Sequence, residues 1–184
     1  MTESKPAAGF SARQLCAAAM LLALGLLLPQ MFHMVGGRPV SSIFSPMHLP
    51  VLICGLLLGP WYGGAVGALT PVLSSLTTGM PPAAILPFMF CELAAYGAVS
   101  GALARRLPLY PALVGAQVAG RAVYALALFA GGTLFGMQCA GPASVLTSAV
   151  TGLPGIVLQL LLAPLLVRLI GQAVPGLTQK KRLI

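Results

Sequence analysis

The chain has 184 residues, of which 58% are hydrophobic and only 7% are charged, and its mean hydropathy is +0.97. A soluble domain carries about 25% charged residues, so this composition excludes a water-soluble globular domain and predicts an all-α integral membrane protein. The formal net charge of +8 has no soluble basic domain to carry it, so it does not indicate nucleic-acid binding.

The apolar runs predict six transmembrane helices in a single membrane domain, residues 1–184. The helices are expected over about residues 11–32, 47–58, 63–77, 83–104, 110–130 and 144–170. The chain length agrees with this number, because a spanning helix needs about 20 residues. No clear small-residue cleavage site follows the first apolar run, so we expect a retained helix and not a signal peptide.

Residues 45–82 are interrupted by three clusters of proline and glycine. A single tilted helix over residues 46–77 would be about 48 Å long, which exceeds a bilayer core of about 30 Å. A turn at Gly59-Pro60 removes this excess. Glycines at every fourth position from Gly55 to Gly67 allow helices to pack closely. Because interrupted helices hold ligand sites in membrane carriers, we interpret this stretch as the hinge of a substrate pocket.

The basic residues predict the orientation of the chain. With six spans, only Arg38 falls on one side, in a loop expected at Gly36-Gly37-Arg38-Pro39. All the others except Arg121, which lies within a predicted span, fall on the opposite side, so the positive-inside rule places both termini in the cytoplasm. These residues are Lys5, Arg13, Arg105, Arg106, Arg168, Lys180, Lys181 and Arg182.

Glu92 and Arg121 are the ionisable residues deep within the predicted spans, where such groups are costly and usually functional. Their helices are antiparallel neighbours, so we expect both side chains at similar depth. Two interpretations stay open: an ion pair that holds two helices together, or a pair that meets a polar ligand in an outward-facing cavity. Further polar residues favour the cavity, and they are Tyr96, Gln117, Tyr124 and Gln159.

Three other features have a simple and a functional interpretation. His33 and His48 could bind a proton or a ligand, although histidines near helix ends are commonly just hydrated. The Ala19-x-x-x-Ala23 stripe on the first helix indicates close contact with another helix. Five methionines on the outer side could line an adaptable apolar pocket or fill space; they are Met31, Met34, Met47, Met80 and Met89.

Motifs of common enzyme classes are missing from the sequence. The chain has no aspartate, no GxxxxGK[ST] phosphate loop and no HExxH motif. We therefore expect no enzymatic activity and no cofactor bound by this chain. An intramembrane enzyme or scaffold stays as one alternative. A stand-alone proton-coupled secondary transporter, in which Glu92 would carry the proton, is the other.

The order and spacing of several short motifs between about residues 12 and 170 resemble the S components of energy-coupling factor (ECF) vitamin transporters, which are membrane-embedded substrate-binding subunits. The motifs are MHLPVL at residues 47–52, LGPWYG at 58–63, TGMPP at 78–82, ELAAYG at 92–97, AGR at 119–121 and GLPGI at 152–156. The resemblance implies high-affinity binding of a small water-soluble vitamin by a multi-pass protein of the bacterial cell membrane.

The resemblance also implies partners and site residues. A transmembrane coupling subunit would dock on Ala19 and Ala23, and two ATPase subunits would bind the ATP. The ligand cavity would open to the outside, with the Arg38 loop and residues 78–82 as lids. The residues proposed for substrate binding are Glu92, Tyr96, Gln117, Arg121, Tyr124, Gln159, His48 and Arg38.

Arg121 suits a carboxylate ligand, because a guanidinium forms charge-assisted hydrogen bonds with carboxylates. This favours an acidic vitamin such as pantothenate. The argument is lost if Glu92 already neutralises Arg121.

Overall fold

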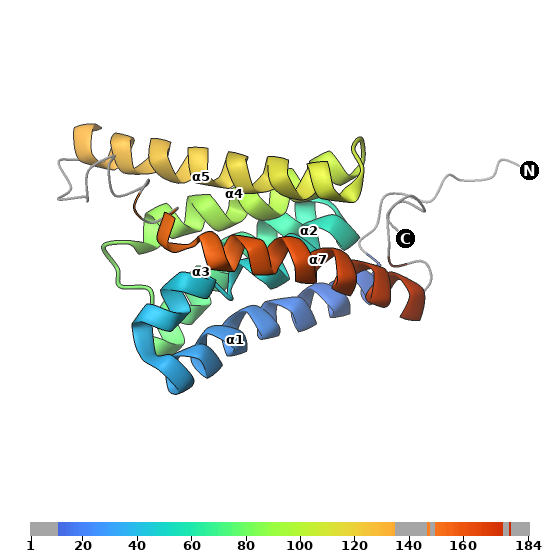
Figure 1. The fold of residues 1–184 in the computed structure, drawn as a ribbon, viewed down its shortest axis with the longest axis horizontal. Helices are drawn as coiled ribbons and strands as arrows, with labels where there is room; N and C mark the ends of the chain where they lie inside the picture. Colours follow the sequence, from blue (N-terminus) through green and yellow to red (C-terminus); the bar gives the residue numbers. More distant parts are fainter. Residues whose placement is uncertain (1–10, 135–146, 148–149, 175–176, 178–184) are drawn as a thin grey trace, which may run out of the picture.

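The computed structural model describes residues 11–134, 147, 150–174 and 177, and for residues 38–42 and 134 it describes the backbone only. The described residues form an all-helical bundle with no strand (Figure 1). Its helices are α1 (Ala12–Phe44), α2 (His48–Leu58), α3 (Pro60–Thr78), α4 (Leu86–Ala104), α5 (Leu109–Leu134) and α7 (Leu153–Ala173).

The prediction of a loop at residues 36–39 is wrong, because these residues lie within helix α1. The chain stays helical to Phe44 and is interrupted only at Gly37, whose φ of 68° lies in the left-handed region that glycine adopts without a steric penalty. Past this kink, the Phe44 ring packs against Phe32, with 5.7 Å between the ring centroids. One glycine therefore makes the bend for which a loop was expected.

The predicted turn at Gly59-Pro60 is confirmed. Gly59 has a φ of 97°, and Pro60 begins α3 in the first helical turn, where its missing N–H costs no hydrogen bond. Helix α2 has only 11 residues, and nearly all of them are buried. A helix that is apolar all round belongs in a core, and α2 contacts α1, α3, α4, α5 and α7.

The regularly spaced glycines bring α2, α3 and α4 into backbone contact. A methyl group on Gly97 would overlap the backbone of Gly63, and one on Gly67 would overlap the carbonyl of Leu93. A methyl group on Gly55 would meet the Gly97 carbonyl in the same way. The close packing predicted from this spacing is thus present, and it places Glu92 on α4 beside the start of α2.

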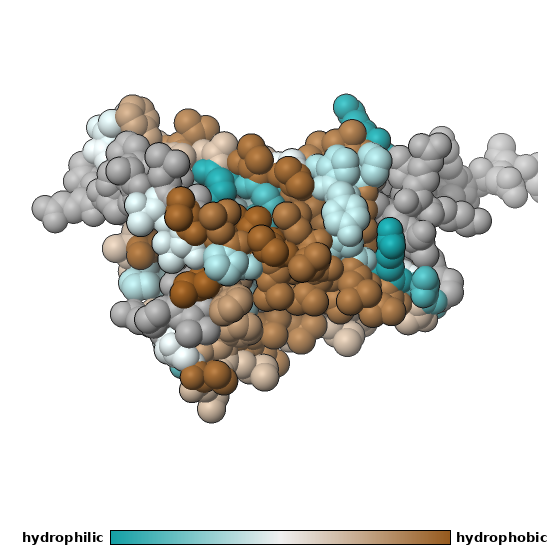
Figure 2. All heavy atoms as spheres, viewed as in Figure 1, coloured by the Kyte–Doolittle hydropathy of each residue, from teal (hydrophilic) through white to brown (hydrophobic). Residues whose placement is uncertain are grey.

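Four of the described helices are long and apolar enough to cross a membrane, and their candidate spans are Ala12–Gly37, Leu86–Ala104, Leu109–Thr133 and Leu153–Ala173. Helix α2 is shorter than a span. Many outward-facing side chains of the long helices are apolar, as Leu24, Val118 and Leu161 illustrate. Figure 2 shows apolar residues over much of the face on which α7 lies. The bundle therefore has the surface of a membrane protein.

The helix order places the start of α1, the turn between α2 and α3, the connection between α4 and α5 and the end of α7 at one end of the bundle (Figure 1). Arg13, Arg105, Arg106 and Arg168 lie toward that end. The other end carries the connection between α1 and α2 and the connection between α3 and α4.

Three predicted helix starts differ from the observed ones, and each observed helix has a proline in its first turn, because prolines begin helices more readily than they continue them. Helix α3 begins at Pro60 and not at residue 63. Helix α4 begins at Leu86 and not at residue 83, with Pro87 in its first turn. Helix α7 begins at Leu153, with Pro154 in its first turn. Thr147, Val150 and Thr151, within the helix predicted from residue 144, are also helical, and a turn at Gly152 separates them from α7. Most of residues 144–149 lie outside the described residues.

Candidate ligand pocket

A cavity of about 460 Å³ lies at the end of the bundle that carries the connection between α1 and α2. Pockets for small molecules commonly measure about 300–1,000 Å³, so this one is large enough for a vitamin-sized ligand. Its walls are mostly apolar. They consist of Pro29, His33, Ser45, Pro46, Met47, His48, Ser74, Met80, Pro81, Pro82, Ile85, Met89, Glu92, Arg121 and Tyr124.

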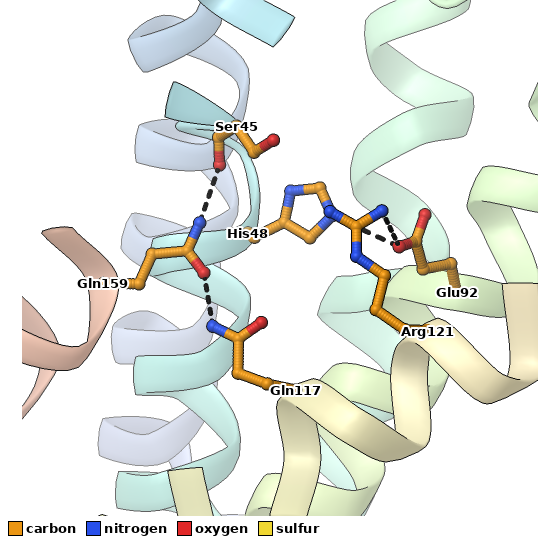
Figure 3. A network of polar contacts seen from close by, with 6 residues as sticks. All are labelled: Ser45, His48, Glu92, Gln117, Arg121 and Gln159. Carbon is orange, nitrogen blue, oxygen red and sulfur yellow. Dashed lines mark hydrogen bonds and ion pairs between the residues drawn. The ribbon is translucent and has the colours of Figure 1, made fainter. Parts of the chain in front are cut away.

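The ion pair between Glu92 and Arg121 forms the charged part of the wall. Arg121 Nη1 on α5 lies 3.2 Å from Glu92 Oε1 on α4, and the two side chains are 20% and 4% exposed. Figure 3 shows the guanidinium of Arg121 directed at the carboxylate of Glu92. The predicted common depth of these residues is thus confirmed, and the pair is both an interhelical contact and part of the cavity.

His48 lies in the same wall at the start of α2. It is only 6% exposed, so it is not the hydrated histidine that its place near a helix end suggested. Its Nε2 lies 3.9 Å from Glu92 Oε1, which is too long for a hydrogen bond. Its ring meets the ring of Tyr96 edge to face, with 5.0 Å between centroids.

Tyr96 supports the pocket and does not line it. Its side chain is fully buried one turn after Glu92 on α4. Gly120 on α5 makes room for it, because a methyl group there would lie 2.8 Å from the tyrosine ring. This contact explains why a glycine precedes Arg121.

Gln117 and Gln159 form a separate buried network that touches the pocket through Ser45. Gln117 Nε2 donates to Gln159 Oε1 at 2.7 Å, and Gln159 Nε2 donates to the Ser45 carbonyl at 3.3 Å (Figure 3). The same carbonyl accepts the backbone N–H of His48 at 3.1 Å. Neither glutamine lines the cavity, so the network positions the connection that carries Ser45 and His48.

The remaining predicted residues divide into three groups. Tyr124, His33 and three of the methionines (Met47, Met80 and Met89) line the cavity. Met31 and Met34 are exposed and do not line it. The side chain of Arg38 lies outside the described residues. The predicted lid at residues 78–82 contributes its last three residues to the wall, and Ser75 Oγ donates to the Pro81 carbonyl at 2.9 Å.

Several lining residues were not predicted as site residues from the sequence, and the main ones are Ser74, Ser45 and Ile85. A serine on a glycine-rich helix and an isoleucine in an apolar run carry no signal of their own. Only the packing of α3 against its neighbours and the path of the connections bring them to the cavity.

Ala19 and Ala23, predicted to dock a partner, are exposed on α1 beside the exposed side chains of Leu15 and Met20. Their small side chains leave this part of the α1 surface open to another helix.

A helical bundle with an apolar outer surface and a cavity whose wall contains an ion pair has the architecture expected of a membrane protein that binds a small molecule. The family model of the ECF transporter substrate-specific component matches residues 13–167, so the chain belongs to that family. Comparisons with curated proteins and with solved structures returned no match.

Family membership fixes the general role of the chain. It is a substrate-binding S component of an ECF transporter and not an enzyme. It is a membrane protein that associates with an energy-coupling module and takes a small-molecule substrate.

Proposed function

We propose that this chain captures a small water-soluble vitamin with high affinity and delivers it to an ATP-driven importer in the bacterial cell membrane. The cavity beside the Glu92–Arg121 pair supports this proposal, because its wall combines apolar residues with a charged pair in one site. Such a site suits a molecule that has an apolar body and a polar head.

An acidic vitamin such as pantothenate is the particular cargo that Arg121 supports. Its carboxylate would accept hydrogen bonds from the guanidinium. Arg121 already pairs with Glu92, with 3.2 Å between Nη1 and Oε1. A ligand carboxylate must therefore share Arg121 with Glu92 or displace Glu92 from it. His48, whose Nε2 lies 3.9 Å from the same Glu92 oxygen, is a group that can offer Glu92 another partner.

Matched acid and neutral ligands test the choice of cargo. Binding of pantothenate and panthenol, nicotinate and nicotinamide, and biotin and biotin amide is measured by calorimetry on the purified protein. We expect the acid of one pair to bind at least tenfold more tightly than its neutral partner. A preference for the neutral member would overturn the acidic cargo, and no binding by any vitamin would overturn the vitamin proposal.

The proposed partners are a transmembrane coupling subunit and two ATPase subunits that bind the ATP, with the vitamin cavity open to the outside. In proteoliposomes, uptake should require these subunits and ATP. A stand-alone proton-coupled transporter would instead accumulate the vitamin under a pH gradient without them.

A further inference from the structure

Ser74 differs from the other serine and threonine residues of α3. The hydroxyls of Thr70, Ser75, Thr77 and Thr78 each donate to a backbone carbonyl. The Ser74 hydroxyl has no hydrogen-bond partner, although the residue is only 1% exposed and lines the cavity. Buried polar atoms almost always have a partner, so this hydroxyl is a strong candidate for contact with a ligand.

His48 has the same property in the same cavity. Both of its ring nitrogens are buried and lack a hydrogen bond. The carboxylate of Glu92 and the guanidinium of Arg121 form an ion pair with each other, although Glu92 Oε1 and Arg121 Nε also lack a hydrogen-bond partner. The cavity therefore offers, besides one charge pair, a hydroxyl and an imidazole whose hydrogen-bonding capacity is unused.

We propose that Ser74 and His48 form a neutral hydrogen-bonding subsite that binds a hydroxyl or amide group of the ligand. A serine hydroxyl both donates and accepts, and a neutral imidazole has one donor and one acceptor nitrogen. An uncharged group that also donates and accepts can satisfy both residues without bringing a further charge beside Glu92 and Arg121. The apolar body of the ligand then lies against Met47, Met80 and Met89.

This subsite rests on the proposed function, because it assigns a second recognition element to the same ligand. It adds Ser74 to the binding residues and selects among vitamins by an uncharged group, whether or not a carboxylate meets Arg121.

The test compares two buried serines that differ in their hydrogen bonds. Ser74→Ala removes an unpartnered hydroxyl, whereas Ser100→Ala removes one that donates to the Gly97 carbonyl at 3.0 Å, away from the cavity. His48→Phe keeps a ring against Tyr96 and removes both nitrogens. Thermal unfolding first identifies which of pantothenate, panthenol, nicotinamide, biotin amide, thiamine and riboflavin stabilises the wild-type protein most, and calorimetry then measures its affinity for each variant.

We expect Ser74→Ala and His48→Phe to bind that vitamin at least fivefold more weakly. The unfolding midpoint of unliganded Ser74→Ala should equal or exceed that of the wild type, because no hydrogen bond is lost. Ser100→Ala should behave in the opposite way, with unchanged affinity and a lower midpoint. Wild-type affinity in Ser74→Ala, or a midpoint lowered as in Ser100→Ala, would overturn the subsite and leave the vitamin-binding function intact. If neither these six compounds nor nicotinate or biotin stabilises the wild-type protein, the vitamin cargo and the subsite are both overturned.

Discussion

At the scale of single residues, the pair of Glu92 and Arg121 dominates the chemistry of the pocket. The two charges sit 3.2 Å apart in a wall that is otherwise mostly apolar. A buried charge without a partner is strongly destabilising, while a satisfied pair costs much less. Each of the two charges must therefore keep a partner, which is either the ligand or the other residue of the pair.

A double-mutant cycle distinguishes a ligand contact from a purely structural pair. If Arg121 contacts the ligand, Arg121→Ala should weaken binding by about 2–4 kcal/mol, roughly thirty- to a thousandfold, because a charge-assisted hydrogen bond is lost. Ligand affinity and thermal stability are measured for Arg121→Ala, Glu92→Gln and the double variant.

The double variant decides whether Arg121 contacts the ligand or only neutralises Glu92. If Arg121 serves only to neutralise Glu92, replacing the carboxylate by an amide removes the uncompensated charge, and both stability and binding should recover. Recovery of binding in the double variant would therefore show that Arg121 does not contact the ligand.

At the scale of helices, the connection between α1 and α2 is held from two sides. The Ser45 carbonyl accepts hydrogen bonds from the His48 N–H and from Gln159 on α7. Gly155, one turn before Gln159, lies against the carbonyls of Ile43 and Phe44 so closely that a methyl group there would be 2.6 Å from each oxygen. Helix α7 thus sets the position of the pocket wall without lining the cavity.

Replacing the glutamines tests this arrangement. Gln159→Leu leaves the amide of Gln117 buried without a partner and should lower stability by about 1–3 kcal/mol. Gln117→Leu combined with Gln159→Leu removes both amides, so it should cost less than the sum of the single changes. Hydrogen exchange at the His48 amide should nevertheless rise in the double variant, because Ser45 has lost the α7 contact. Unchanged exchange would contradict a positioning role for Gln159.

The exposed face of α1 is the proposed docking surface for the coupling subunit. Ala19→Leu with Ala23→Leu should block uptake in the assembled transporter and leave vitamin binding unchanged, because bulky side chains keep a partner helix from close van der Waals contact. As a control, Leu15→Ala with Met20→Ala reduces bulk on the same exposed surface and should retain uptake. Normal uptake by the Ala19 and Ala23 double variant would contradict the docking proposal and indicate that these alanines face lipid.

At the scale of the whole molecule, the orientation in the membrane follows from charge. Arg13, Arg105, Arg106 and Arg168 lie toward one end of the bundle, whereas the cavity and the part of α1 that contains Arg38 lie toward the other. Because cytoplasmic ends of membrane proteins carry the excess of lysine and arginine, the cavity end is expected to face outward.

Cysteine labelling of intact cells checks this orientation. In a chain whose four native cysteines are replaced, Ala84→Cys in the connection between α3 and α4 should react with a membrane-impermeant maleimide. Arg106→Cys, between α4 and α5, should react only after the membrane is permeabilised. Both positions are exposed in the structure, so accessibility within the protein does not limit the reaction. The reverse pattern would invert the predicted topology.

The sequence by itself determined the membrane class, the turn at Gly59-Pro60 and the common depth of Glu92 and Arg121. These features depend on local quantities: the apolar fraction, the backbone freedom of glycine and the rise of a helix per residue. The break at Gly37 was placed near the right residue but was predicted as a loop, because sequence pattern cannot show that one glycine suffices for the bend.

Only the tertiary structure decided which polar residues meet. Gln117 shares the face of Arg121 on α5, yet it donates to Gln159, which in turn donates to the Ser45 carbonyl. Arg121 pairs instead with Glu92. Tyr96 lies behind the wall because Gly120 leaves space for its ring. Ser74 reaches the cavity because glycines let α3 lie directly against α4. Such contacts join residues far apart in the chain, and their geometry depends on how closely the helix backbones approach one another.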